Sequence, residues 1–496
     1  MKKYKFVTEN IIVIGSGFSS LAAATSLASE GKKVTILEKN SQTGGRARQF
    51  TTSGFTFDMG PSWYWMPDVF EAYFERFGKK VSDYYELVRL DPSYQVVFDD
   101  KEFVDIPAAY EELKALFEKY EKGGGAELDK FLAEAEYKYR AGMDEFVHKP
   151  SQSILEFVKW KVISGVFKLQ LFTSMTSHIA KHFKNSKLIE LLEFPVLFLG
   201  AKPQDTPALY SLMNFADIKL GTWYPMGGMH KIVEGMTALA KEKGVEFVLD
   251  CEVKKLEVRN GKVAKAITTK GDFEGTHFIS GADYNHTDKH LLDPEFHNYT
   301  EKYWDTRKMA PSSLLFYLGV NKKVEKLRHH NLFFDKSFNQ HAIEIYDDPQ
   351  WPSNPLFYVC VPSLTDKTVA PEGKENVFIL VPVAPDLEDN EETREKYYHM
   401  VMDRLESLTN QKIRDHVIYK KSYAHADFKA DYHAFKGNAY GLANTLTQTA
   451  ILKPNLRNKK LKNLFYTGQL TTPGPGVPPS LISGQVVAKE VLKTLA

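Results

Sequence analysis

The strongest constraint on the fold of this chain is a glycine turn close to its N-terminus. A short apolar run, Ile11 to Ile14, predicts a buried strand, and the alanine-rich residues from Leu21 to Glu30 predict a helix. Between them lies the turn Gly15-Ser16-Gly17-Phe18-Ser19-Ser20. Gly15 permits the tight bend, Gly17 lets the backbone approach a pyrophosphate, and Ser20 replaces the usual small third residue. The six turn residues are therefore predicted to bind a dinucleotide.

A second strand, Val34 to Leu37, ends at Glu38 and Lys39. An acidic residue at this spacing accepts hydrogen bonds from a ribose hydroxyl. This much is compatible with NAD as well as FAD. The following Gly44-Gly45-Arg46 resembles the second glycine pair of the amine-oxidase-like flavoproteins, which lines the FAD diphosphate and the approach to the flavin. We therefore predict that the cofactor is FAD and that the residues binding it include Glu38, Lys39, Gly44, Gly45 and Arg46.

The C-terminal region repeats the pattern of strand, glycine loop and helix. Asn463 to Gln469 predicts a strand that ends near Gly468, and Ser480 to Val491 predicts a helix. The loop between them contains Gly476 and Val477. A glycine-rich loop that opens a helix presents backbone N–H groups and the positive end of a dipole. These three residues are predicted to contact the flavin.

Bulk composition excludes several classes of protein. The chain has 496 residues, 43% of them hydrophobic and 26% charged, and a net charge of +1. This length predicts two or three domains, and the near-zero charge gives no field that would attract nucleic acid. The two cysteines, Cys251 and Cys360, fit a reducing compartment and form no metal motif. The sequence has no run of 18 apolar residues, so it predicts no spanning helix.

Several further motifs are similar to those of bacterial carotenoid desaturases of the phytoene desaturase type, nearly from end to end. They are Gly54-Phe55-Thr56-Phe57-Asp58-Met59-Gly60-Pro61-Ser62, Tyr224-Pro225-Met226-Gly227-Gly228, Ala370-Pro371-Glu372-Gly373 and the loop Pro473-Gly474-Pro475-Gly476. The resemblance implies an FAD enzyme that desaturates a C40 carotenoid precursor, with phytoene towards lycopene as the expected reaction. It also implies that the backbone of Val253 meets the adenine and that the C-terminal helix favours the anionic reduced flavin.

The expected fold class is mixed α/β and α+β. A Rossmann-like FAD-binding domain is predicted to be discontinuous, built from residues 1–100, 216–305 and 446–496. Residues 306–445 carry strand patterns that suggest an antiparallel substrate-binding sheet. Residues 101–215 are helical by periodicity and form the third, membrane-associating subdomain.

The membrane prediction rests on the stretch from Phe157 to Ile189, which has no acidic residue. Six lysines, Lys159, Lys161, Lys168, Lys181, Lys184 and Lys187, alternate there with aromatic and aliphatic residues. Such a pattern is typical of an interfacial helix, although a helix packed inside the domain with a lysine edge fits equally well. A C40 hydrocarbon shifts the balance, since each CH₂ exposed to water costs about 0.8 kcal/mol. We expect peripheral attachment to the cytoplasmic side of a membrane.

Catalytic residues are harder to assign. A hydrocarbon offers no polar handle, so the site should be an apolar tunnel in which the flavin accepts a hydride. For a proton acceptor the sequence offers two weak candidates, Glu193 and Asp217. No metal site is expected. The His329-His330 pair is interpreted as a solvated or interface feature, and His425 with Asp427 as a turn. Oxygen or a quinone would reoxidise the flavin.

Other activities on the same scaffold stay open at this point. A hydroxycarotenoid 3,4-desaturase or a carotene isomerase would differ only in tunnel shape, which no motif encodes. An amine oxidase or protoporphyrinogen oxidase is the next alternative, and a prenyl-binding protein without flavin is the last.

Overall fold

The computed structural model describes residues 9–99, 101–151, 170, 172–197, 200–445 and 448–495. Its first layer is a parallel sheet of five strands in the order β19-β13-β1-β2-β9. The strands are β1 (Asn10–Ile14), β2 (Lys33–Leu37), β9 (Glu246–Val248), β13 (His277–Ser280) and β19 (Leu464–Tyr466). They come from all three segments predicted to form the discontinuous domain. Their near-continuous apolar sequences suit a sheet that is covered on both faces.

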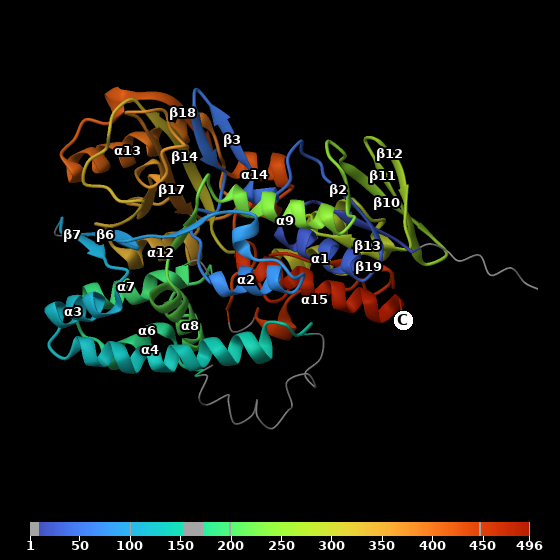
Figure 1. The fold of residues 1–496 in the computed structure, drawn as a ribbon, viewed down its shortest axis with the longest axis horizontal. Coiled ribbons are helices and arrows are strands. Elements are labelled where there is room, and N and C mark those ends of the chain that lie inside the picture. The colour runs from blue at the N-terminus through green and yellow to red at the C-terminus, as the bar shows by residue number, and fades with distance from the viewer. Residues whose placement is uncertain are drawn as a thin grey trace, which may run out of the picture.

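Helix α1 (Phe18–Ser29) lies between α9 (His230–Glu242) and α15 (Val477–Leu495) (Figure 1). Almost all of α1 is buried. Small residues allow the close approach: a Cβ added to Gly484 of α15 would lie 2.0 Å from the carbonyl oxygen of Ser19. The two ends of the chain are thus packed together, which brings both glycine loops to one edge of the sheet.

A three-stranded antiparallel sheet extends from this domain. It contains β10 (Val253–Arg259), β11 (Lys262–Thr268) and β12 (Gly271–Glu274). The predicted turn at Asn260-Gly261 joins the first two strands, and both of its residues have positive φ, 51° and 70°. Two positive φ angles are characteristic of the hairpin turn that an Asn-Gly pair favours.

The largest sheet has seven strands in the order β18-β14-β17-β16-β15-β6-β7. They are β6 (Tyr94–Phe98), β7 (Phe103–Ile106), β14 (Ser312–Val320), β15 (His330–Phe334), β16 (Phe357–Cys360), β17 (Glu375–Val383) and β18 (Val417–Tyr423). Two predictions need correction here. The sheet is mixed, because β15 pairs with β6 in parallel. It also recruits β6 and β7 from before residue 107, since strand pairing over such a sequence distance leaves no local pattern.

Alternate residues of this sheet enter two different cores. Leu314, Phe316 and Leu318 of β14 join the cluster that packs against α13 (Glu391–Thr409). Leu315 and Tyr317 point to the opposite face, where they join the main core. This alternation is the period-2 geometry of a strand. It leaves the second face of the sheet, with α12 (Phe338–Tyr346), turned towards the layer of the five-stranded parallel sheet.

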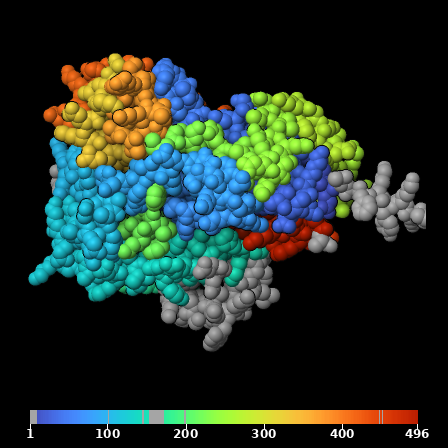
Figure 2. Space-filling model, in the orientation of Figure 1, coloured from blue at the N-terminus to red at the C-terminus, as the bar shows by residue number. Residues whose placement is uncertain are grey.

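The predicted helical region is largely confirmed in its described part. It contains α3 (Tyr110–Tyr120), α4 (Gly124–Ala141), α6 (Met175–His182), α7 (Ser186–Leu197) and α8 (Leu212–Phe215). In Figure 2 this region, in cyan, forms the surface below the seven-stranded sheet. No helix within the described residues is both long enough and apolar enough to span a bilayer.

Shorter elements connect these layers. They are β3 (Gln49–Thr52), β4 (Phe55–Asp58), α2 (Pro67–Glu75), β5 (Leu87–Arg89), β8 (Trp223–Pro225), α10 (Tyr284–His290), α11 (Glu301–Asp305) and α14 (His425–Tyr432). The β3–β4 hairpin packs against the seven-stranded sheet, and Tyr317 donates a 2.7 Å hydrogen bond to the carbonyl of Met59, directly after β4. This contact fixes the chain that follows β4 at the boundary between the two sheets.

Candidate functional site

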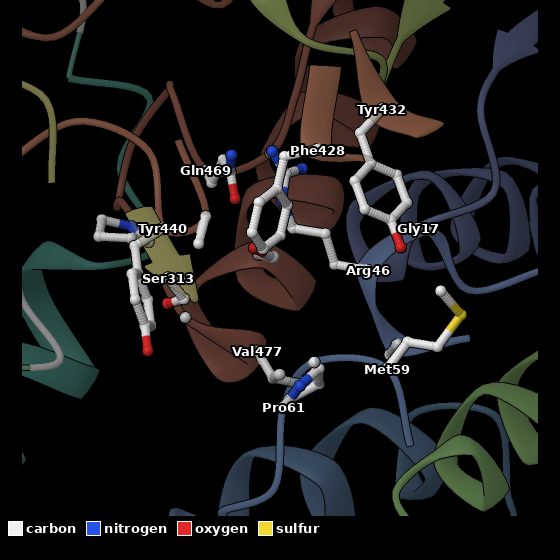
Figure 3. A pocket seen from close by; sticks show the side chains of 18 of the residues that line it. Gly17, Arg46, Met59, Pro61, Ser313, Phe428, Tyr432, Tyr440, Gln469 and Val477 are labelled. Atoms are coloured by element: carbon white, nitrogen blue, oxygen red, sulfur yellow. The ribbon is translucent and has the colours of Figure 1, made fainter. Parts of the chain in front are cut away.

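One cavity of ≈ 450 Å³ joins the parallel sheet to the seven-stranded sheet (Figure 3). Every residue predicted to bind the cofactor lines it, except Ser20. The cavity begins where β1 and β2 end, which is the place where open α/β sheets bind their ligands. It continues past Met59 and Pro61 to the face of the seven-stranded sheet.

The glycine turn leaves an open anion site at the start of α1. Gly15 donates to the Leu37 carbonyl (2.8 Å), and Gly44 donates to the Ser16 carbonyl (3.0 Å), which locks both glycine segments together. Gly17 is the N-cap of α1, where no side chain caps the helix. A Cβ on Gly17 would find no atom within 4 Å. The first-turn N–H groups therefore face free space, as a bound pyrophosphate requires.

Glu38 closes the other side of this turn. Its Oε2 accepts hydrogen bonds from the backbone N (2.8 Å) and Oγ (2.5 Å) of Ser16, and its Oε1 accepts from the backbone N (2.8 Å) and Nδ2 (2.9 Å) of Asn40. The carboxylate is only 4% exposed, but it still lines the cavity. Lys39 follows it and donates to the Ala430 carbonyl at 2.5 Å. Val253, at the start of β10, lines the same end of the cavity.

Ser20 has a packing role instead. A Cβ on Gly281, at the end of β13, would lie 2.0 Å from Ser20 Oγ. The serine thus lies directly against this strand, away from the cavity lining. The expected close helix–strand packing is present, but the direct cofactor contact predicted for Ser20 is not supported by its position.

Arg46 is a buried cation with unused hydrogen-bonding capacity. Its Nη2 donates to the Asn438 carbonyl (3.2 Å), while its Nε is buried without a partner. The guanidinium lies 5.1 Å from the ring centre of Tyr432, and Figure 3 shows both beside Phe428. Burial lowers the pKa of Arg46, and the charge of Asp283 partly opposes this shift. An unsatisfied buried donor in the cavity wall fits a ligand with acceptor atoms.

The C-terminal loop forms the wall opposite Arg46. Gly468 donates to Ser483 Oγ (3.1 Å), and Gly476 has a φ of 108°, which suits glycine. Helix α15 then begins at Val477, which lines the cavity. Because Pro478 and Pro479 have no N–H group, Val477 is the only donor among the first three residues of the helix. The loop therefore offers fewer N–H groups than a glycine-rich loop suggests, although the helix dipole remains.

The far part of the cavity is apolar. Its lining includes Phe194, Leu315, Leu332, Phe334, Phe338, Ile345 and Leu356. His341 lies among these residues, but both of its ring nitrogens are paired, with the Pro382 carbonyl (2.9 Å) and the Leu356 N–H (3.1 Å). Among the described lining residues the acidic ones are Glu38, Glu252, Asp283 and Asp431, which all belong to the dinucleotide end or to α14. Such a chamber suits an uncharged, hydrophobic ligand.

Residues 18–492 match the family of flavin-containing amine oxidoreductases. The chain belongs to this family. It is 41% identical to the carotenoid 3,4-desaturase of Haloarcula japonica over 98% of this chain and 99% of the other. It is 30% identical to the zeta-carotene-forming phytoene desaturase of Myxococcus xanthus, over 97% and 93%. The predicted resemblance to carotenoid desaturases of the amine-oxidase-like superfamily is thus confirmed.

Among solved structures, an oxidoreductase from Methanosarcina mazei has a similar fold. The TM-score is 0.63 over 97% of this chain and all of the other, with 17% sequence identity. At this identity the likeness concerns the fold alone, and it agrees with the flavoprotein architecture of the family.

Neither predicted proton acceptor lines the cavity. Glu193 is buried in α7, where its Oε1 accepts from Thr176 Oγ1 (2.5 Å) and burial raises its pKa. Asp217 is also buried and accepts from the hydroxyls of Tyr94 (2.8 Å) and Thr222 (3.3 Å). Both carboxyl groups are engaged in hydrogen bonds away from the described cavity lining. Their positions argue against a catalytic role.

The interpretation of His329-His330 as solvated is wrong. The two residues are 5% and 0% exposed, because His330 begins β15 in the interior of the seven-stranded sheet and His329 directly precedes it. His330 pairs with Cys360 of β16. The sequence offers no sign of this burial, since a polar pair next to the charged Arg328 is typical of a surface turn.

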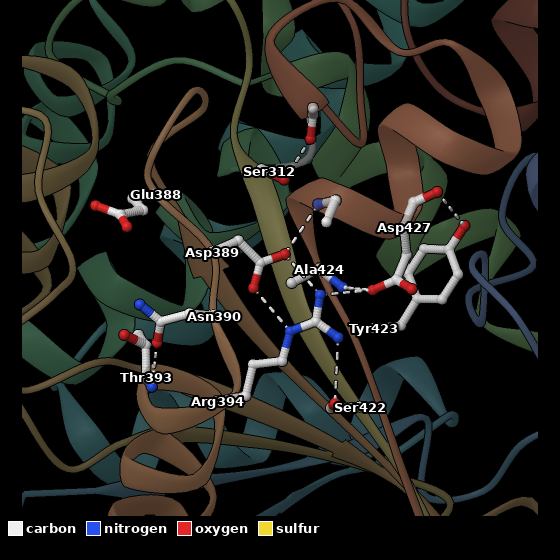
Figure 4. Close-up of polar contacts among 12 residues, drawn as sticks. Ser312, Glu388, Asp389, Asn390, Thr393, Arg394, Ser422, Tyr423, Ala424 and Asp427 are labelled. Carbon is white, nitrogen blue, oxygen red and sulfur yellow. Dashed lines mark hydrogen bonds and ion pairs between the residues drawn. The ribbon is translucent and has the colours of Figure 1, made fainter.

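His425 and Asp427 lie in the first turn of helix α14 instead of in the predicted connecting turn, and both make structural hydrogen bonds. His425 pairs with the Ala384 carbonyl (2.8 Å), and Asp427 accepts from the Ala424 N–H (2.9 Å) at the start of α14. Arg394 of α13 lies between Asp427 (2.7 Å) and Asp389 (2.6 Å) (Figure 4). This ion-pair network holds α14, which supplies Phe428 and Tyr432 to the cavity.

Part of the basic stretch from Phe157 to Ile189, with three of its six lysines, falls outside the described residues, which omit 152–169 and 171. Within the described part, Lys187 forms an ion pair with Glu102 (2.6 Å) and Met175 is fully buried. Phe172 is 86% exposed, the largest value among the exposed large apolar side chains.

Proposed function

We propose that this protein is an FAD-dependent desaturase that introduces a carbon–carbon double bond into a C40 carotenoid. The observation that carries the proposal is the single cavity that runs from the uncapped dinucleotide turn to an apolar chamber. In such a cavity a hydrocarbon chain can reach the reactive ring of a dinucleotide-type flavin without contact with water.

The residues present fit FAD. The glycine turn and the start of α1 would hold the pyrophosphate, Glu38 the ribose, and the backbone at Val253 the adenine, with Arg46 and the start of α15 at the flavin. When bound, FAD supplies a two-electron hydride acceptor. The chain itself contributes orientation of a long substrate and exclusion of water by the apolar walls.

The carotenoid that the enzyme accepts is proposed from its relatives. The 41% identity to a carotenoid 3,4-desaturase favours desaturation of an already extended polyene at its 3,4 bond. Phytoene towards lycopene, the reaction expected from the sequence, has the weaker support of a relative at 30% identity. The name of the first relative does not state whether its substrate carries oxygen, so both hydrocarbon and hydroxylated carotenoids belong in the assay.

Attachment to the cytoplasmic surface of a membrane is part of the proposal. A C40 chain is insoluble, so the enzyme must take it from a bilayer. Phe172, which is exposed within the basic stretch, fits an interfacial contact. Electrons would leave the flavin for oxygen or for a quinone dissolved in the same membrane.

The test is an assay of the purified, FAD-loaded full chain in liposomes. Phytoene, lycopene and a 1-hydroxylated carotenoid are supplied separately, with and without a quinone, and products are separated by chromatography. We expect a product with one more double bond from at least one polyene. If all three substrates are recovered unchanged while the protein retains FAD, the proposal is wrong.

An amine oxidase is the alternative to exclude. Aromatic residues such as Tyr432 and Tyr440 line the cavity, but the apolar chamber has no carboxylate among its described residues that could balance an ammonium group. A buried ammonium group without such a partner is unfavourable. Hydrogen peroxide release with a panel of amines, at rates above that with carotenoids, would favour the oxidase.

A further inference from the structure

A tyrosine and a histidine form a short hydrogen bond in the wall of the cavity. The hydroxyl of Tyr358 lies 2.6 Å from Nδ1 of His330. Both side chains come from neighbouring antiparallel strands: His330 pairs with Cys360, and Tyr358 lies two residues before Cys360 on the same face of the sheet. The strand pairing therefore fixes this contact, because diagonal neighbours on one face lie within reach of long side chains.

Of the two residues, Tyr358 reaches the cavity and His330 lies behind it. Tyr358 lines the cavity together with Ser62 and Trp63. These two residues directly follow Pro61, which lies beside Val477 in the part of the cavity where the flavin is expected (Figure 3). His330 is fully buried and does not line the cavity. Within the described lining, Tyr358 therefore connects the cavity to the imidazole by a direct hydrogen bond.

The environment of His330 keeps its imidazole unprotonated. Its Nε2 is buried without a hydrogen-bond partner, and burial together with His329 holds the pKa of His330 below its usual range. The imidazole is therefore neutral at physiological pH. The Trp63 ring stacks on it, with ring centres 4.1 Å apart and planes at 11°. An aromatic face at this distance stabilises an imidazolium once it forms.

We propose that Tyr358 and His330 are the proton-accepting pair of the desaturation, with Trp63 as the residue that positions the imidazole. The inference rests on the proposed function. The desaturation removes two hydrogens from adjacent carbons, and no acidic side chain among the described residues lines the apolar chamber to take the proton. The tyrosine hydroxyl is a polar group of this chamber with a base directly behind it.

The desaturation breaks two C–H bonds on adjacent carbons. When bound, FAD would be the two-electron oxidant that takes the hydride of the first C–H bond. The adjacent carbon is then acidic because it is next to an electron-deficient carbon. Its C–H bond breaks, the proton passes to the Tyr358 oxygen, and the hydroxyl proton of Tyr358 passes to His330 Nδ1. The electron pair of this second C–H bond becomes the new double bond.

The experiment compares FAD-loaded full-length variants in liposomes with the carotenoid that the wild type desaturates. Tyr358→Phe and His330→Gln should each slow net anaerobic flavin reduction by about 10²-fold or more, the usual contribution of a general base, because the hydride returns to the substrate when the proton is not removed. The double variant should be no slower than the slower single variant, because the two residues act as one unit. Deuterium at the carbon that loses the proton should slow the variants more than the wild type.

Tyr397→Phe is the matched control. Its buried hydroxyl also donates a 2.6 Å hydrogen bond, to the Pro352 carbonyl, but Tyr397 lies in α13 outside the cavity lining. It should leave flavin reduction unchanged. FAD content and melting temperature are measured for each variant, and Tyr358→Phe decides the question alone if His330→Gln does not fold, since phenylalanine fills the same space.

The assignment would be overturned by flavin reduction in Tyr358→Phe within threefold of the wild type, or by losses that simply add in the double variant. A raised KM for hydroxylated substrates with an unchanged kcat would also overturn it, since Tyr358 would then only bind a substrate hydroxyl. If the wild type desaturates no carotenoid at all, the proposed function itself fails, and the role of the pair fails with it.

Discussion

Ser16 and Glu38 are joined by two hydrogen bonds, from the backbone N (2.8 Å) and the Oγ (2.5 Å) of the serine to one carboxylate oxygen. The glycine turn and the end of β2 are therefore tied together before any ligand binds. In Glu38→Ala the buried N–H group of Ser16 and the partly buried N–H group of Asn40 lose their acceptors, which costs about 1–3 kcal/mol. We expect a lower free energy of unfolding in urea and loss of FAD on gel filtration.

Glu30→Ala is the control for this change, because Glu30 is an exposed glutamate at the end of α1. It should keep both stability and FAD content. If Glu38→Ala retains as much FAD as the wild type, the carboxylate only stabilises the turn and does not contact the ribose.

Two glycines of the same layer should respond in opposite ways to an added methyl group. In Gly17→Ala the new Cβ finds no atom within 4 Å, so the apoprotein should remain as stable as the wild type while FAD binding falls at least tenfold. In Gly484→Ala the Cβ would lie 2.0 Å from the Ser19 carbonyl oxygen. Overpacking of this kind costs about 1–3 kcal/mol, so the apoprotein itself should lose stability. Urea unfolding of the apoproteins measures the change in stability, and FAD titration measures the change in binding. Equal losses of stability in both variants would contradict the free space assigned at Gly17.

The N-terminal and C-terminal glycine loops were predictable because a binding turn needs its residues at fixed short spacings. Gly15, Gly17 and Glu38 are spaced along one strand–helix–strand unit, so their chemistry can be read locally. Ser20 shows the limit even there. Its small size is dictated by Gly281, which lies in another segment of the chain, and the sequence gives no means to separate packing from binding.

The substrate half of the site could not be predicted in the same way. Its wall is built from β15, β16 and α12, whose alternation predicts strands and helices but not which strand lies beside which. The contact between His330 and Tyr358 depends on the β15–β16 register, and the parallel addition of β6 depends on a pairing across more than 200 residues. Tyr358 consequently looks like any aromatic residue of a buried strand.

The Arg394 ion pairs predict a distant effect on the flavin site. Arg394 and Asp389 are 12% and 3% exposed, and removal of one partner of a buried pair costs about 3–5 kcal/mol. In Arg394→Met we expect this loss to concentrate in α14, so that FAD is held less tightly although no lining residue has changed. Limited proteolysis near residue 425 and FAD titration measure it. Arg76→Met, which changes an exposed arginine directly after α2, is the control. If the FAD affinity of Arg394→Met is unchanged, the position of α14 does not determine how tightly FAD is held.

Asp217 provides a prediction on pH, in which the sign follows from burial. Burial raises its pKa from 3.8 to about 7, and the hydrogen bonds from Tyr94 and Thr222 oppose this shift only in part. Because the folded protein binds this proton more tightly than the unfolded chain, the contribution to stability is fully present below about pH 4. It is lost as the pH rises from about 4 to 7.

In Asp217→Asn this loss cannot occur, since an amide keeps the acceptor oxygen for Tyr94 and does not ionise. The variant should be more stable than the wild type at pH 8, nearly equal to it at pH 4, and unchanged in desaturation rate, because Asp217 lies outside the described cavity lining. The free energy of unfolding in urea is measured from pH 4 to pH 8. The control Asp305→Asn, which changes an exposed carboxylate, should alter it at neither pH. A collapse of activity in Asp217→Asn with intact stability would restore this aspartate as a proton acceptor and count against Tyr358 and His330.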